Sequence, residues 1–306
     1  MDLPTGSFLA TVRFGPEEDK TPAGPLTIKP GDFRAKKPFG PDEKLLTGLA
    51  VIPILTSGGR PNLADQLLHP SERAQAAAFP AEARRSSFQS GRIAAKLAIC
   101  QVFPGLAGTE VNITANSLGK PVIVDFPAPY SVSIAHSDHH GAALCFPAEL
   151  PMGVDIETPE EKNRSIIVSI LTPGEIALLQ AQRNRPETVE HSQVTVTDHE
   201  SALMPTQDNS LQILHVMWTA KEAAGKANGL GFRLPVEQYE IEKIKTLEDH
   251  NIRSWICNFK HLGEITTISL DWKGTILTIA FPRGSGFGDE FMRLFRNGPY
   301  GHLHEW

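Results

Sequence analysis

One short apolar stretch of the sequence carries two carboxylates: GVDIE at residues 153–157. Alternate residues of a β-strand share a face, so a strand here places Asp155 and Glu157 side by side and turns Val154 and Ile156 toward the core. Adjacent carboxylates repel each other unless a cation lies between them. Their oxygen atoms suit a hard divalent cation such as magnesium. An amphipathic edge strand with solvated acids is the alternative that this stretch leaves open.

A second segment, WTAKEAAGK at residues 218–226, has the composition of a helix. Trp218, Glu222 and Lys226 recur every four residues, which places them on one helical face. One alternative is that Glu222 and Lys226 do no more than form an intrahelical ion pair, worth about 0.3 kcal/mol. Lys221 adds a second cation beside Glu222, and the surrounding alanines and glycine permit close approach by another element. A third carboxylate flanked by two lysines could complete a metal site and bind phosphate oxygens.

Basic residues gather in the first half of the chain. Lys120 lies in a Gly-Lys-Pro turn, and His136 ends a predicted strand, where its ring could donate to a phosphate. Four more lie on one long predicted helix: Arg84, Arg85, Arg92 and Lys96. Each of these residues taken alone is typical of a solvated surface. Together, facing a carboxylate cluster in the second half, they indicate a pocket for a polyphosphate held with a metal.

Composition and charge indicate a globular protein. The 306 residues are 41% hydrophobic and 21% charged, with a net charge of −6. A nucleic-acid binder usually has a basic excess, so we expect no nucleic-acid partner. No apolar run approaches the ~18 residues of a membrane span, and residues 1–20 lack the apolar core of a signal peptide. Three isolated cysteines are typical of reduced thiols, and we therefore expect a cytoplasmic protein without a membrane partner.

Several common catalytic templates are absent from the sequence. It contains no P-loop and no GxGxxG loop for a nucleotide. It contains no HExxH or CxxC motif for zinc and no GxSxG elbow for a serine nucleophile. The SDHH run at residues 137–140 has metal-ligand types, but a hairpin turn is expected there.

The order of predicted elements suggests a duplicated α+β fold. Residues 46–150 and 151–283 each give a helix followed by a pair of strands, so we expect two similar halves with the ligand between them. Residues 1–45 are a poorly patterned extension with one strand. Residues 184–210 have the polar composition of a long insertion, and residues 284–306 that of a flexible tail.

Helices are predicted at His69–Phe79, Ala81–Phe103, Leu171–Gln182 and His215–Asn228. The third has a capping box, with Thr172 as N-cap and Glu175 three residues later. Strands are predicted at Ser7–Phe14, Val111–Ala115, Pro121–Val124, Ser131–Ala135, Ala142–Phe146, Gly153–Glu157, Trp255–Phe259, Thr266–Asp271 and Ile276–Phe281.

GVDIE, followed about sixty residues later by WTAKEAAGKANG, resembles the paired signature of the 4′-phosphopantetheinyl transferases of the large, surfactin-synthetase-type monomeric class. That signature reads (I/V)G(I/V)DxE and then WxxKEAxxK. Upstream, ARRSSFQSGRIAAK, LGKPVI and SVSIAHS are similar to the family's arginine-rich helix, GKP turn and His-Ser strand, in family order. The resemblance implies a monomer whose two α+β halves are related by a pseudo-twofold, with coenzyme A between them.

The resemblance also implies a role for each matching residue. Asp155, Glu157 and Glu222 would hold magnesium on the coenzyme A pyrophosphate. Lys221 and Lys226 would bind phosphate oxygens near the reacting phosphorus and, with Glu222 as ligand or base, form the catalytic set. The residues expected to hold the adenosine 3′-phosphate and the pyrophosphate are Arg85, Arg92, Lys120 and His136.

The reaction so implied is phosphoryl transfer. A serine hydroxyl of an acyl or peptidyl carrier protein attacks the β-phosphorus of coenzyme A, takes the 4′-phosphopantetheine group and releases 3′,5′-ADP. Two alternatives remain: a catalytically silent carrier- or coenzyme A-binding protein, and a magnesium-dependent pyrophosphate hydrolase. The insertion at residues 184–210 falls between the two motifs, so the sequence does not determine the carrier or its biosynthetic pathway.

Overall fold

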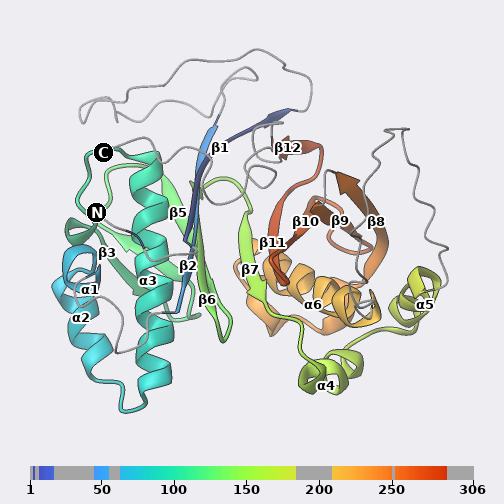
Figure 1. Cartoon of the computed structure of the whole chain (residues 1–306). Coiled ribbons are helices and arrows are strands. Elements are labelled where there is room, and N and C mark those ends of the chain that lie inside the picture. The colour runs from blue at the N-terminus through green and yellow to red at the C-terminus, as the bar shows by residue number, and fades with distance from the viewer. Residues whose placement is uncertain are drawn as a thin grey trace, which may run out of the picture.

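The computed structural model describes residue 3 and residues 7–16, 45–54, 63–183, 209–249 and 252–287. Within these ranges the fold is α+β, as predicted (Figure 1). Two five-stranded antiparallel sheets face each other across a shared core, and each carries one long helix on its other face. None of the helices in these ranges combines the length and the apolar character needed to cross a bilayer.

The first sheet has the strand order β12-β1-β2-β6-β5. Its strands are β1 (Phe8–Pro16), β2 (Leu45–Pro53), β5 (Tyr130–His136), β6 (His140–Pro147) and β12 (Ser285–Phe287). Helix α3 (Glu82–Val102) covers this sheet through a core of small and aliphatic residues. Strand β12 is the last element that the structure describes, and it pairs with β1, so the first and the last described strands lie in one sheet.

The second sheet has the order β7-β11-β10-β9-β8. Its strands are β7 (Gly153–Glu157), β8 (Ile241–Asp249), β9 (Ile252–Phe259), β10 (Ile265–Trp272) and β11 (Thr275–Pro282). Helix α6 (Asn209–Ala227) packs on one face of this sheet. Strand β7 is an edge strand that pairs only with β11 in this sheet, and its other edge lies beside β5 of the first half.

Shorter elements complete the two halves: α1 (Leu63–Leu67), α2 (Pro70–Ala77), β3 (Asn112–Ala115), β4 (Pro121–Val124), α4 (Arg164–Ser169) and α5 (Pro173–Arg183). Five elements are not predicted by the sequence patterns: α1, β2, α4, β8 and β12. Helix α6 begins six residues before its predicted start. The predicted insertion and tail lie mostly outside the described residues, as does most of the N-terminal extension.

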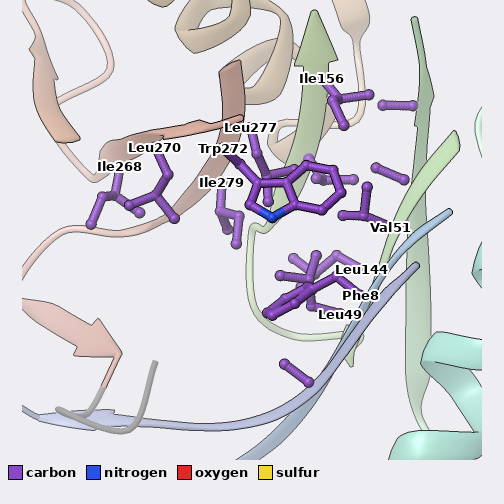
Figure 2. Close-up of a cluster of buried hydrophobic side chains, with 14 of the residues drawn as sticks. Phe8, Leu49, Val51, Leu144, Ile156, Ile268, Leu270, Trp272, Leu277 and Ile279 are labelled. Carbon is purple, nitrogen blue, oxygen red and sulfur yellow. The ribbon is translucent and has the colours of Figure 1, made fainter. Parts of the chain in front are cut away.

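The core between the sheets is built from aliphatic side chains of both halves. Figure 2 shows Leu49, Val51 and Leu144 from the first sheet facing Ile156, Leu277 and Ile279 from the second. Beside this core, Val154 N donates to Ser133 Oγ at 3.1 Å, which joins β7 to β5. We call this boundary between the two halves, where β7 lies against β5, the seam. Burial of this much apolar surface holds the two halves together.

In each half, one glycine lets a strand pass directly beneath the backbone of the long helix. A Cβ atom added to Gly48 of β2 would lie 2.0 Å from Ala98 O of α3. A Cβ atom added to Gly153 of β7 would lie 2.2 Å from Ala223 O of α6. Both glycines are therefore required by a close approach of backbone to backbone.

Each half also contains a buried glutamate–lysine pair with the same set of contacts. In the first half, Glu72 accepts hydrogen bonds from His69 N at 3.0 Å and Ile113 N at 3.1 Å, and Lys96 Nζ lies 2.9 Å away. Both side chains of the pair are no more than 1% exposed. The glutamate thereby joins α2, α3 and β3.

In the second half, Glu175 accepts from Thr172 N at 2.9 Å and Ile241 N at 2.8 Å, and Lys221 Nζ lies 2.8 Å away. The bond from Thr172 N, with the reciprocal bond from Glu175 N to Thr172 Oγ1, confirms the predicted capping box. These repeated contacts support the pseudo-twofold duplication, which otherwise stays a prediction.

Candidate functional site

Strand β7 presents Asp155 to helix α6. Because Gly153 allows the helix to approach, Lys226 Nζ lies 2.7 Å from Asp155 Oδ1 and 3.1 Å from Val154 O. Asp155 is 6% exposed, and its second oxygen, Oδ2, has no hydrogen-bond partner. An unpartnered buried carboxylate oxygen is costly, so this atom is suited to a further cation or donor.

Glu157 and Glu222 complete a group of carboxylates around Asp155. Burial and the charge of Asp155 raise the pKa of Glu157 to about 8 and the pKa of Glu222 to about 7, and Lys226 offsets part of both effects. Asp138, in the turn between β5 and β6, raises the pKa of Glu157 further. Carboxylates in this position are stabilised by a bound proton or by a cation.

The donors in this group match a hard divalent cation by their chemistry. All are carboxylate oxygens, the ligand type that magnesium prefers, and Asp155 Oδ2 lacks any other partner. Among the described residues, no three His, Cys, Asp or Glu side chains already converge as metal ligands. Asp155, Glu157 and Glu222 would therefore have to turn toward a shared ion when it binds.

His136, at the end of β5, brings the first half to this acidic group. Partial burial lowers the pKa of His136, and the positive charges of Lys226 and Arg84 lower it further, whereas Asp155 raises it. These interactions show that groups from both halves share one electrostatic environment. The sequence analysis noted Arg84 but did not select it, because no local signal distinguishes it from the arginine beside it.

The turn after His136 is fixed by Ser137. Its hydroxyl oxygen accepts hydrogen bonds from His139 N at 3.3 Å and His140 N at 3.1 Å, while Ser137 N bonds to His140 O at 2.8 Å. A serine that closes its own turn in this way is typical of a hairpin. The predicted hairpin is confirmed, and Ser137 serves to orient the end of β5.

The Gly-Lys-Pro turn reaches the second half at the end of α6. Asn116 Oδ1 accepts from Lys120 N at 3.0 Å and fixes the turn, and Gly119 has a φ of 81°, which favours glycine. A Cβ atom added to Gly229 would lie 3.6 Å from Lys120 Nζ. The structure thus places the ammonium group of Lys120 just beyond the last turn of the helix that carries Lys226.

Comparison with known proteins bears on the second half. Residues 151–271 match the family model of the 4′-phosphopantetheinyl transferase superfamily. The chain carries a domain of this superfamily. We refer to residues 151–271 as the transferase domain; it contains β7 and α6, and with them every predicted metal ligand.

Two solved structures are similar to this chain in part. A holo-(acyl-carrier-protein) synthase from Bacillus anthracis, described in complex with CoA (3′,5′-ADP), is 21% identical, covers 33% of this chain and 92% of its own, and has a TM-score of 0.29. A holo-[acyl-carrier-protein] synthase from Thermotoga maritima is 22% identical, covers 39% and 72%, and has a TM-score of 0.28. No match was found among curated proteins.

Lys221 of the transferase domain does not lie with the carboxylate group. Its side chain is fully buried and its ammonium group pairs with Glu175. At about 100° per residue, Lys221 lies on a different face of α6 from Glu222 and Lys226. The sequence analysis grouped Lys221 with the phosphate-binding residues because it follows the same motif. Nothing in the local sequence reveals that Glu175, forty-six residues earlier, is its partner.

Arg85 and Arg92 make their contacts within the first half. Arg85 Nη1 donates to Phe79 O at 3.1 Å. The guanidinium group of Arg92 lies over the ring of Phe88, 5.1 Å from its centroid, and its Nε atom is 4.0 Å from Glu72 Oε1. A role for either arginine at the ligand stays a prediction. The structure places His136 within electrostatic reach of Lys226, and it places Lys120 beside Gly229 at the end of α6.

Proposed function

We propose that the chain is a 4′-phosphopantetheinyl transferase of the large monomeric type. It moves the 4′-phosphopantetheine group of coenzyme A onto a serine of an acyl or peptidyl carrier protein and releases 3′,5′-ADP. One observation carries the proposal: the paired Asp155 and Lys226 of the transferase domain lie within electrostatic reach of His136 from the other half. Lys120 of that half reaches the end of the same helix, beside Gly229. An acidic group beside basic groups suits a metal-bound pyrophosphate with a further phosphate.

The three carboxylates have the role of holding the metal. Asp155, Glu157 and Glu222 would bind magnesium, which when bound supplies positive charge to the pyrophosphate oxygens. Asp155 Oδ2 is the atom with no other partner. Burial, together with the charge of Asp155, raises the pKa of both glutamates, and a bound cation would stabilise their charged forms. We assign Glu222 to this role first, since its carboxylate shares the neighbourhood of Asp155.

The basic residues bind phosphate oxygens and orient them. Lys226 stabilises the charge that develops on the reacting phosphorus, because its ammonium group already lies beside Asp155, one of the proposed metal ligands. His136 and Lys120 hold the 3′-phosphate from the first half. The carrier serine oxygen forms a bond to the β-phosphorus as the bond from phosphorus to 3′,5′-ADP breaks, and the serine proton passes to a carboxylate or to water.

A direct test uses apo carrier proteins of fatty-acid, polyketide and peptide synthesis, incubated with the protein, coenzyme A and magnesium. Intact-mass spectrometry should show a gain of one phosphopantetheine on at least one carrier, with an equal amount of 3′,5′-ADP. Hydrolysed coenzyme A with unmodified carriers would instead establish the pyrophosphate hydrolase. Binding of coenzyme A without any product would establish a silent binding protein.

A further inference from the structure

Helix α6 carries a buried histidine two turns before Glu222. His215 is 0% exposed, its Nδ1 lies 2.9 Å from Leu211 O, and its Nε2 lies 3.3 Å from Glu160 N. A carbonyl oxygen only accepts hydrogen bonds, so Nδ1 carries the proton and Nε2 accepts from the Glu160 amide. Burial lowers the pKa of His215, which favours the neutral ring that this arrangement requires.

His215 lies on the face of α6 that carries the site. Steps of seven and four residues lead from His215 to Glu222 and Lys226, which at about 100° per residue places all three within about 40° of one another. Lys226 binds Asp155 in the middle of β7, and His215 binds Glu160 beyond the end of that strand. Helix α6 is thus hydrogen-bonded at two points to β7 and the segment that follows it, and Glu222 lies between these points.

The distances along the two segments match. The eleven residue steps from His215 to Lys226 span about 16 Å at ~1.5 Å per step of the helix. The five residue steps from Asp155 to Glu160 span about 16 Å at ~3.3 Å per step if the chain is extended, and Glu160 itself has extended φ and ψ angles. The segments run in opposite directions, so Glu222 falls opposite Glu157.

We propose that His215 is a positioning residue for the reaction. By accepting a hydrogen bond from the Glu160 amide, it holds the segment after β7 against α6 and so keeps Glu157 opposite Glu222. Its effect on turnover rests on the proposed function, whereas the hydrogen bond is a property of the fold and can be tested separately. The fixed tautomer is the distinctive feature, because a histidine that only filled space would have no such requirement.

Two substitutions separate positioning from packing. The amide oxygen of His215→Gln can reach the place of Nε2, whereas His215→Asn reaches only the place of Nδ1. We expect the Asn variant to lose exchange protection at the Glu160 amide and to lower kcat about tenfold, with KM for coenzyme A changed less than about threefold. The Gln variant should restore protection and keep kcat within about threefold of wild type.

Equal Glu160 exchange in the two variants, or equal kcat, would overturn the role of His215 while leaving the transferase assignment intact. If wild-type protein modifies no carrier, the proposed function fails, and amide exchange alone decides the inference. A third measurement needs no variant: nitrogen-15 shifts of His215 in the wild-type protein at pH 7. The neutral Nδ1–H tautomer supports the inference, and an Nε2–H tautomer or an imidazolium contradicts it.

Discussion

The two halves of the molecule share their supporting contacts and differ in the residues that face the seam. Lys96 and Lys221 each pair with a buried glutamate. In each half a glycine, Gly48 or Gly153, lies against the carbonyl group of the helix residue two positions after that lysine. Aligning the halves on these four positions relates β2 to β7 and α3 to α6. The contacts present in both halves belong to the scaffold.

The same alignment shows what is specific to the transferase domain. Ala50 and Ile52 of β2 stand at the positions of Asp155 and Glu157, and both are fully buried apolar residues. On the helices, Leu97 corresponds to Glu222 and Gln101 to Lys226. A carboxylate or ammonium group found in only one half is not needed for the shared fold. We therefore propose that the groups that act in the reaction lie mainly in the second half. Lys221, by contrast, has a counterpart in Lys96 and groups with the scaffold.

The largest effect should come from breaking either buried ion pair. Lys221→Met leaves the buried Glu175 without its cation, and Lys96→Met leaves the buried Glu72 with only Arg92, 4.0 Å away. We expect each substitution to lower the free energy of unfolding by about 3–5 kcal/mol. Denaturant unfolding followed by circular dichroism measures both. A matched control replaces both partners, as in Glu175→Leu with Lys221→Met, and should cost less than Lys221→Met alone. A Lys221→Met protein as stable as wild type but without turnover would return Lys221 to the catalytic set.

A comparison of equivalent helix positions gives the next effect. Lys226→Ala should reduce kcat/KM for carrier modification about a hundredfold, because it removes a charged donor at the reacting phosphorus. Gln101→Ala, at the matching position of α3, should stay within about twofold of wild type. Similar losses in the two variants would contradict the assignment of chemistry to one half.

The contribution of the first half is expected to be smaller and specific to coenzyme A. Lys120→Ala and His136→Ala should each raise KM for coenzyme A about tenfold and leave KM for the carrier nearly unchanged, since each removes a charge-assisted contact. Dephospho-coenzyme A, which lacks the 3′-phosphate, should show a smaller penalty for at least one of them. Equal penalties with both substrates would remove these residues from the 3′-phosphate.

The smallest effect concerns pH and stability without metal. The pKa of Glu157 is about 8 in the folded protein and ~4.3 in an unfolded chain, so between these values the folded state binds more protons and stability falls as pH rises. In chelator, Tm should fall by roughly 6 °C more from pH 5 to pH 8 in wild type than in Glu157→Gln. Magnesium should restore part of this loss at pH 8, and equal pH dependence in the two proteins would contradict the expectation.

Local patterns predicted much of the fold and of the site. The capping box before Glu175 and the apolar alternation around Asp155 each depend on a few neighbouring residues, and the structure contains both the helix and the strand they predict. Strands β2 and β8 were missed because the first is a nearly continuous apolar run and the second has a mixed charged pattern. Neither shows the clean alternation typical of a half-buried strand.

Long-range partners were the part that sequence patterns could not supply. Lys221 looks equivalent to Lys226 within one helix, and only the contact with Glu175 separates their environments. His215 was not selected, although its spacing of seven residues from Glu222 was visible, because its partner is a backbone amide after β7. Spacing along a helix identifies a shared face, but which element covers that face is decided by tertiary packing.

The proposed transfer reaction depends above all on the carboxylates of β7, Asp155 and Glu157. Its most direct test is intact-mass analysis of an apo carrier incubated with coenzyme A, magnesium and either wild-type protein or Asp155→Ala. Wild type should add one phosphopantetheine per carrier, and the variant should show less than a tenth of that rate while giving the circular dichroism spectrum of the folded protein. A folded Asp155→Ala protein that modifies the carrier at more than a tenth of the wild-type rate in saturating magnesium would contradict the account.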